Sequence, residues 1–229
     1  MSAVTVKRLR KDYTLGKTTV AALRGVDLQV PQGAFIVLSG PSGSGKTTLL
    51  NLIGCLDAPT EGEVWIGEKL VSGLPERKLS WFRLHALGFV FQAFNLIPVL
   101  DVYENVELPL VARPDIPVRT RRQRVETFIE QVGLKDHVRH RPSELSGGQQ
   151  QRVAVARALA AGPQIVLADE PTANLDSATA SKLIDLMERL NRERGVTFLF
   201  STHDPQVIER ARRVVRLRDG GVVADERDV

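Results

Sequence analysis

Two glycine-rich turns, each followed by a helix-forming segment, contain the first residues of this sequence that could do chemistry. One is GPSGSGKTT at residues 40–48, and the other is LSGGQ at residues 145–149. A glycine-rich turn that opens a helix presents backbone N–H groups and the positive end of the helix dipole, so it attracts anions. Two such sites in one chain need an explanation.

The first turn fits the phosphate-binding pattern G-x-x-x-x-G-K-[ST] and lies between a predicted strand and a predicted helix. Its glycines let the backbone wrap a β-phosphate, Lys46 places a positive charge between the β and γ phosphates, and the Thr47 hydroxyl can ligate Mg²⁺. The predicted nucleotide-binding residues of this turn are Gly40, Pro41, Ser42, Gly43, Ser44, Gly45, Lys46, Thr47 and Thr48.

Polar side chains at the ends of three other apolar runs suit the same chemistry. In IVLADE, Asp169 can hold a metal and Glu170 can orient or deprotonate a water, because open α/β sheets bind ligands at the carboxyl ends of their strands. Gln92 ends the GFVF run and could reach the metal, and His203 follows TFLF, where a neutral imidazole could touch a γ-phosphate. Taken alone, each of these residues could simply be a polar residue at the end of a strand. The neighbouring phosphate loop favours a functional role for them.

The elements that must position these residues follow from the hydrophobic pattern. Apolar runs alternate with helix-length segments, which predicts βαβ units and a parallel sheet. The runs at 35–38, 165–168 and 197–200 are apolar throughout, as expected of central strands covered on both faces. Residues 4–33 alternate instead and predict a small antiparallel sheet over the first turn, whereas residues 93–160 have helical spacing.

Composition and charge limit the classes of protein to which this chain could belong. With 229 residues, a net charge of +4 and a single cysteine, Cys55, the chain can form no internal disulfide, and we interpret Cys55 as a packing residue. No run approaches the ~18 apolar residues of a membrane span, so we expect a cytosolic chain. The arginine clusters at 119–124 and 210–218 lack interleaved aromatics, which favours solvated faces over nucleic-acid binding.

These motifs together resemble the ATP-binding subunit of an ABC transporter over essentially the whole chain. GPSGSGKTT is similar to that family's Walker A, IVLADE to its Walker B, Gln92 to its Q-loop, LSGGQ to its signature, NLD at 174–176 to its D-loop and His203 to its H-loop. The resemblance implies ATP and Mg²⁺ as cofactors, with Thr47, Gln92 and Asp169 around the metal and Glu170, His203 and Lys46 as catalytic residues. It also implies that Tyr13 stacks on adenine and that Asp176 contributes to the nucleotide site.

The resemblance implies an α/β fold: a P-loop NTPase core with a mostly parallel sheet, an N-terminal antiparallel β subdomain and a helical signature subdomain. Residues 1–229 would form a single domain, with 1–92 and 161–229 as the core and 93–160 as the helical subdomain. It also explains the second glycine turn, because in this family two subunits face head to tail and each signature caps the ATP of the other. Residues Ser146, Gly147, Gly148 and Gln149 would therefore contact nucleotide held by a second copy.

Within the family, the chain is similar to the lipoprotein-release (Lol-type) and macrolide-export (Mac-type) branch, although Ala173 stands where that branch commonly has Gly. The resemblance implies a separate integral membrane permease as partner and a peripheral position on the inner face of the cell membrane. The apolar stretch at 93–100, with Phe94, Leu96, Ile97 and Leu100, is the expected partner surface, the alternative being a loop tucked beneath the helical lobe. The competing function is a soluble ABC ATPase acting on nucleic acid or ribosomes, which usually carries a coiled coil or two ATPase units.

Overall fold

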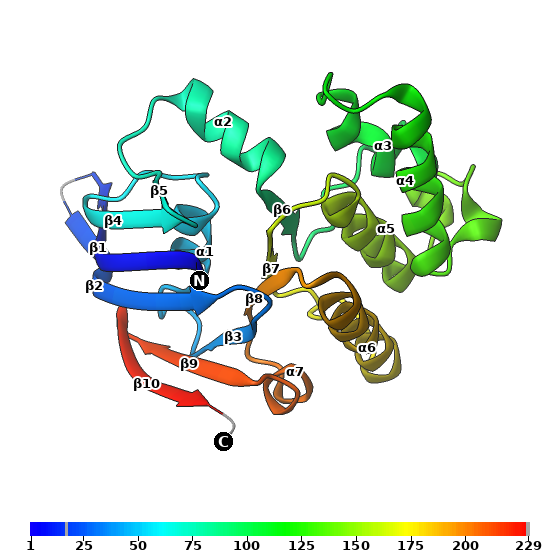
Figure 1. The fold of residues 1–229 in the computed structure, drawn as a ribbon. Helices are drawn as coiled ribbons and strands as arrows, with labels where there is room; N and C mark the ends of the chain where they lie inside the picture. Colours follow the sequence, from blue (N-terminus) through cyan, green and yellow to red (C-terminus); the bar gives the residue numbers. More distant parts are fainter. Residues whose placement is uncertain (17, 228–229) are drawn as a thin grey trace.

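The computed structural model describes residues 1–16 and 18–227, which form two β-sheets and a lobe of helices (Figure 1). The larger sheet has six strands in the order β10-β9-β3-β8-β7-β6. The strands from β9 to β6 are parallel, and β10 joins the edge antiparallel to β9. The bounds of its strands are β3 Phe35–Ser39, β6 Leu87–Val90, β7 Ile165–Asp169, β8 Thr197–Ser201, β9 Arg213–Arg218 and β10 Gly221–Arg227.

The three all-apolar runs occupy the centre of this sheet, as predicted. Strands β3, β8 and β7 are neighbours, and each is buried along its length apart from the half-buried Asp169. Successive side chains of a strand point to opposite faces, so a strand covered on both faces needs no polar positions. In β3, Phe35 and Val37 join one hydrophobic cluster, and Ile36 and Leu38 join the other.

The smaller sheet is antiparallel, has the strand order β2-β1-β4-β5, and contains the predicted region 4–33. Its first two strands form a long hairpin from Ser2↔Pro31 to Leu15↔Thr18, with several register irregularities. This sheet packs with α1 on the cluster that holds Ile36 and Leu38. The bounds of its strands are β1 Ser2–Leu15, β2 Thr18–Pro31, β4 Glu61–Ile66 and β5 Lys69–Leu70.

The helices of the lobe lie within the segment predicted to be helical, and Figure 1 shows them grouped away from the antiparallel sheet. Helix α3 begins with a capping box, in which Asp101 accepts from the Glu104 N–H and the Glu104 carboxylate accepts from the Asp101 N–H. The domain boundaries inferred from sequence remain a prediction. The helices are α1 Lys46–Ile53, α2 Glu76–His85, α3 Val102–Val111, α4 Val118–Gln131, η1 Lys135–His137, η2 Pro142–Glu144, α5 Gly147–Ala160, α6 Ser177–Arg194 and α7 Pro205–Glu209.

The lobe helices and the sheet share one continuous core. Apolar residues of α3, α4 and α5, among them Val106, Phe128 and Val155, belong to the same cluster as Phe198 and Phe200 of β8. The lobe is therefore packed on the sheet that positions the candidate catalytic residues. Among residues 1–16 and 18–227, no helix has both the length and the apolar character needed to cross a membrane.

Candidate active site

The first glycine turn links β3 to α1 and has the backbone conformation of a phosphate cradle. Gly40 has φ 150° and Gly45 has φ 101°. A Cβ atom on Gly40 would lie 2.1 Å from the backbone oxygen of Leu217, and one on Gly45 would lie 2.7 Å from that of Ala22. The β1–β2 hairpin and the β9–β10 region thus approach the turn so closely that only glycine fits.

The N-terminus of α1 has no side-chain cap among the described residues, since its N-cap position is Gly45. The first N–H groups of a helix have no partners inside the helix, so at α1 they are available to an anion. The Lys46 side chain is almost fully buried, and its ammonium donates to the carbonyls of Gly40 (2.7 Å) and Pro41 (3.0 Å). The turn therefore gathers backbone N–H groups and a buried positive charge at one point.

The predicted metal residues Thr47 and Asp169 meet beside this turn. The Thr47 hydroxyl donates to the Asp169 carboxylate at 3.1 Å. A hydroxyl and a carboxylate are hard oxygen ligands, and Mg²⁺ completes its coordination with phosphate and water oxygens, so the pair fits Mg²⁺ bound together with a nucleotide. Among the described residues there is no group of three or more His, Cys, Asp and Glu side chains that would hold a metal by itself.

Gln92 lies beyond its strand and not at its end, because β6 stops at Val90. The residue is exposed, and its backbone carbonyl accepts from the Asn174 side chain at 2.9 Å. This contact ties the segment after β6 to the segment after β7. Gln92 therefore lines the site from a loop and not from a strand end.

Glu170 is held in place by two side-chain contacts. Its carboxylate accepts from the Thr202 hydroxyl at 3.0 Å and lies 2.8 Å from Nδ1 of His203. Its backbone has φ 45°, an uncommon conformation for a residue other than glycine, and it turns the chain directly after β7. The side chain is 16% exposed, whereas that of His203 is 75% exposed.

The contact between Glu170 and His203 fixes the roles of the ring nitrogens. An ionised carboxylate can only accept, so Nδ1 of His203 carries the proton and a neutral ring keeps a lone pair on Nε2. In this arrangement the neutral ring cannot donate to a phosphate oxygen through Nε2. A donating contact requires either the charged imidazolium or a new orientation of the exposed ring.

A cavity of about 660 Å³ brings most of the predicted residues together. Residues 41–48, Tyr13, Gln92, Glu170 and His203 all line it. Gly40 and Asp169 do not line the cavity but contact residues that do. Sequence reasoning missed the other lining residues, which are Val20, Ala21, Ala22 and Ala173. Val20, Ala21 and Ala22 belong to the β1–β2 hairpin that covers the turn, and no local motif marks them.

Tyr13 lies on β1 at the rim of this cavity. Its hydroxyl donates to Asp57 at 2.8 Å, and the Lys11 ammonium lies 4.8 Å from its ring centroid. Burial, together with the hydrogen bond to Asp57, raises the pKa of the Tyr13 hydroxyl. The ring is therefore held by its neighbours on one side, and adenine stacking on it remains a prediction.

The second glycine turn opens α5 and differs from the first. Ser146 is the N-cap, the Gln149 N–H donates to its hydroxyl at 3.3 Å, and the Gln149 amide oxygen accepts from the Ser146 N–H at 2.8 Å. Ser146 is exposed, whereas Gly148 is buried against Thr179 of α6. Residues 146–149 all belong to the described chain, and they do not line the cavity around Lys46.

Asp176 also performs a capping role in the single chain. It is the N-cap of α6 and accepts from the N–H groups of Ala178 (3.1 Å) and Thr179 (3.0 Å). Hydrogen bonds from Thr179, then from Ala178, lower the pKa of the Asp176 carboxyl. Asp176 does not line the cavity around Lys46, and its contribution to a nucleotide site remains a prediction.

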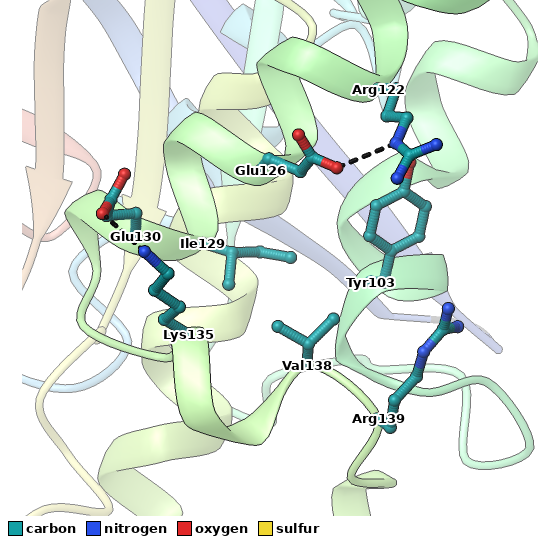
Figure 2. A pocket seen from close by; sticks show the side chains of 8 residues that line it. All are labelled: Tyr103, Arg122, Glu126, Ile129, Glu130, Lys135, Val138 and Arg139. Atoms are coloured by element: carbon teal, nitrogen blue, oxygen red, sulfur yellow. Dashed lines mark hydrogen bonds and ion pairs between the residues drawn. The ribbon is translucent and has the colours of Figure 1, made fainter.

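A further cavity of about 600 Å³ lies on the helical lobe and is not part of this site (Figure 2). Figure 2 shows its charged side chains paired across the rim, Arg122 with Glu126 and Lys135 with Glu130. Tyr103, Ile129 and Val138 supply its apolar part. A third cation of the lining, Arg139, is largely exposed and pairs with Asp101, which does not line the cavity.

Comparisons with known proteins identify relatives over almost the whole chain. The family model described as ABC transporter matches residues 23–173. An uncharacterized ABC transporter ATP-binding protein of Thermotoga maritima is 47% identical over 95% of this chain and 92% of its own length. The macrolide export ATP-binding/permease protein MacB of Syntrophobacter fumaroxidans is 47% identical over 96% of this chain, which spans 31% of that longer protein.

Solved structures of similar chains give the same result. MJ0796, an uncharacterized ABC transporter ATP-binding protein of Methanocaldococcus jannaschii, is 46% identical over 98% of this chain and 97% of its own length. The dimeric structure of this ABC transporter cassette matches with a TM-score of 0.91 over 98% of both chains. Its dimeric post-hydrolysis state, bound to ADP and Pi, matches with a TM-score of 0.90 over 98% of both chains.

Proposed function

This chain belongs to the ABC transporter family of ATP-binding proteins, and we propose that it drives a separate membrane permease by closing an ATP-bridged dimer. It is an ABC ATPase that binds ATP, and the predicted fold class is confirmed. One observation carries the assignment of residues. Lys46, Thr47, Glu170 and His203 line a single cavity, with Asp169 in contact with Thr47.

In the proposed mechanism the first glycine turn binds the phosphates. Backbone N–H groups of residues 43–48 and the N-terminus of α1 face the β-phosphate, and Lys46 exchanges its contacts with Gly40 and Pro41 for phosphate oxygens. Thr47 and Asp169, with Gln92 within the same cavity, are the residues that would hold Mg²⁺. When bound, the metal would neutralise charge that develops on the transferred phosphoryl group.

Glu170 is the proposed general base for the attacking water. It is a mostly buried carboxylate at the carboxyl end of β7, and Thr202 and His203 fix its two oxygens. A base that is held in one orientation loses little entropy when the water is aligned. Thr202, which is buried, is therefore a positioning residue, because it contacts Glu170 and not the cavity.

The signature turn is proposed to act on nucleotide held by a second copy. The capping box at Ser146 uses the N–H of Gln149 and leaves the N–H groups of Gly147 and Gly148 at the start of α5 for an external anion. Two chains placed head to tail would bring each α5 N-terminus to the other chain's γ-phosphate. ATP then links the chains, and loss of the γ-phosphate removes the link.

The proposed permease surface is the apolar stretch 93–100 with the adjoining groove. Ile97 is 39% and Val99 73% exposed, whereas Phe94, Leu96 and Leu100 are half-buried. Next to this stretch lies a groove of about 310 Å³ whose apolar lining includes Leu84, Phe89, Phe91, Leu108 and Pro109. We expect it to receive a short amphipathic cytoplasmic helix of the permease, which would place this chain at the inner face of the membrane.

The lipoprotein-release or macrolide-export branch is the proposed setting, because MacB relatives join a similar ATP-binding region to a permease in one protein. The nucleic-acid alternative has less support. Within the two arginine clusters, Arg210 pairs with Asp185, Arg213 with Asp225 and Arg122 with Glu126. These pairs leave less free positive charge for phosphate backbones than the sequence suggests.

The decisive single substitution is Glu170→Gln. The amide keeps the shape of the side chain but cannot act as a base, so we expect ATP hydrolysis to fall by about 10²- to 10⁴-fold while ATP binding persists and an ATP-bridged dimer accumulates. Glu188→Gln, a surface residue of α6 paired with Arg192, is the matched control and should hydrolyse ATP normally. Hydrolysis at a near-normal rate by Glu170→Gln, measured by phosphate release, would overturn the assignment.

A further inference from the structure

A histidine outside every predicted motif contacts the signature turn directly. His137 ends the 3-10 turn η1, and Nε2 of the Gln149 amide lies 3.0 Å from Nε2 of its ring. Gln149 is the third residue of α5 and the second member of the capping box at Ser146. The ring of His137 is thus in contact with the side chain that shapes the signature turn.

The hydrogen bonds fix the orientation of the Gln149 amide. Its oxygen accepts from the Ser146 N–H at 2.8 Å, so its NH₂ group must point toward His137. The ring must then accept through the lone pair on Nε2. A neutral imidazole that accepts through Nε2 carries its proton on Nδ1.

The second nitrogen of the His137 ring, Nδ1, is the one that carries the proton. Nδ1 of His137 is buried and has no hydrogen-bond partner among the described residues. A buried N–H group without a partner lowers stability, and an aromatic hydrocarbon would fill the same space without that loss. Packing alone therefore does not explain a histidine here, whereas the acceptor that faces Gln149 does.

The segment that carries His137 is also anchored to the start of α3. The Val102 N–H donates to the carbonyl of His140 at 2.9 Å, and the Tyr103 N–H donates to that of Val138 at 3.1 Å. The rings of His137 and His140 lie 5.0 Å apart, centroid to centroid. Figure 2 shows Val138 and Arg139 of this segment, together with Tyr103 of α3, lining the cavity on the lobe. Since α3 follows the stretch 93–100 directly, these hydrogen bonds join the segment that carries His137 to the helix next to the proposed permease surface.

We propose that His137 is a positioning residue for the signature: it holds the Gln149 amide so that the N-terminus of α5 is shaped in advance for a partner's nucleotide. The proposal rests on the proposed function, because it needs the signature to work on a second chain. His137 itself contacts Gln149 and not the cavity around Lys46. Its loss should therefore weaken closure of the dimer and leave nucleotide binding by each chain unchanged.

The test is His137→Phe, made in a Glu170→Gln background so that closed dimers persist. We expect little change in melting temperature, because the unpartnered Nδ1–H is removed while the half-buried Gln149 NH₂ group loses its partner. The affinity of the single chain for fluorescent ATP should be unchanged. The ATP-dependent dimer should weaken about tenfold, as expected from one lost hydrogen bond in each of two chains. His137→Gln, which returns an acceptor near the position of Nε2, should recover most of that loss.

His140→Phe is the matched control, because its ring lies beside that of His137, whereas the hydrogen bond to the Gln149 amide comes from His137. It should close dimers as the parent does. A weaker dimer with a lowered melting temperature in His137→Phe, or no recovery in His137→Gln, would assign His137 a packing role only and overturn the proposal. A dimer of parental strength in His137→Phe would also overturn it.

Ser146→Arg separates this proposal from the proposed function. If Ser146→Arg prevents dimer closure and His137→Phe does not, the signature acts on a second chain and His137 does not position it. If Ser146→Arg itself leaves closure intact, the proposed function fails and the role of His137 fails with it. Dimer content is measured by gel filtration with and without ATP.

Discussion

The two glycine-rich turns both precede helices, yet the N-termini of these helices differ in how the rest of the chain surrounds them. Other parts of the chain closely approach both ends of the turn before α1, where Gly40 meets the backbone of Leu217 and Gly45 meets that of Ala22, whereas residues 41–43 between them are exposed. The turn before α5 carries an exposed Ser146 and a side-chain capping box. We propose that the first is a phosphate site within its own chain and that the second binds a phosphate held by another chain.

Under the proposed function, this difference explains why both turns occur in one ATPase. An anion site enclosed by its own chain holds nucleotide whether or not a second chain is present. An outward-facing helix N-terminus contributes only when another chain brings a phosphate to it. Hydrolysis can then be linked to the opening and closing of a dimer, which a single complete site would not provide.

The largest expected effect is a difference in ATP affinity between a variant of the first turn and a variant of the second. Lys46→Ala removes the buried ammonium, and we expect the single chain to bind ATP about 100-fold more weakly, as for loss of a charge-assisted contact. Ser146→Arg should bind ATP as the parent does, although the lost N-cap lowers stability by about 1 kcal/mol. Titration with a fluorescent nucleotide measures both, and equal losses of affinity would contradict the division between the turns.

A smaller effect is expected from adding one methyl group to each turn. Gly40→Ala forces a side chain into φ 150° and against the Leu217 carbonyl, so we expect a loss of about 2 kcal/mol or more in the free energy of unfolding. A Cβ on Gly147 meets no atom nearer than 3.6 Å, so Gly147→Ala should fold within about 1 kcal/mol of the parent.

Under the proposed function we nevertheless expect the Gly147→Ala variant to close dimers less readily, because its methyl, which would lie against Asn174, Phe94 and Leu175, would stand beside the N–H group offered to a partner's phosphate. Thermal unfolding and ATP-dependent gel filtration, run on both variants, distinguish a folding defect from a dimerisation defect. A destabilised Gly147→Ala chain would mean that this turn is as enclosed as the first.

Sequence predicted the first turn better than its surroundings. The motif at 40–48, the carboxylates at 169 and 170 and the central strands depend on local patterns, and the structure brings them together. The approach of Leu217 to Gly40, the hairpin residues Val20–Ala22 and the contact of Thr202 with Glu170 join segments far apart in sequence. No period or spacing reports such contacts, because side-chain packing decides them.

The apolar stretch 93–100 shows the same limit of prediction from sequence, at the level of single side chains. Lack of periodicity left open whether the stretch is a partner surface or a loop tucked beneath the helical lobe, and it could not say which side chains face solvent. Leu96 packs on the hydrophobic cluster of the lobe, and the carbonyls of Phe94 and Asn95 accept from Arg157. Burial lowers the pKa of that guanidinium. Within this stretch, the large apolar side chains that are exposed belong to Ile97 and Val99.

The smallest expected effect concerns this surface, which should leave both turns unaffected. Ile97→Ser together with Val99→Ser should keep the melting temperature and the isolated ATPase activity within error, since both side chains are exposed. Co-purification with the permease should fall several-fold, because apolar contact area is lost. Val223→Ser, an exposed apolar residue of β10, is the control. An unfolded double variant would show that the stretch is core.

The most direct test of the account mixes two defective chains that carry different affinity tags. Lys46→Ala breaks the enclosed turn and Ser146→Arg breaks the outward-facing turn, so each homodimer has two broken sites. In the mixed dimer, if sites form between chains, one site combines both defects and the other combines an intact Lys46 with an intact Ser146. If both turns of a site came from one chain, every site would stay defective.

The measurement is nucleotide-dependent crosslinking across the interface in assemblies purified through both tags. We predict that the mixed dimer closes on ATP at one restored site, whereas neither homodimer does. Failure of the mixed dimer to close, under conditions in which the parent dimer closes, would contradict the claim that the two glycine turns belong to sites shared between chains.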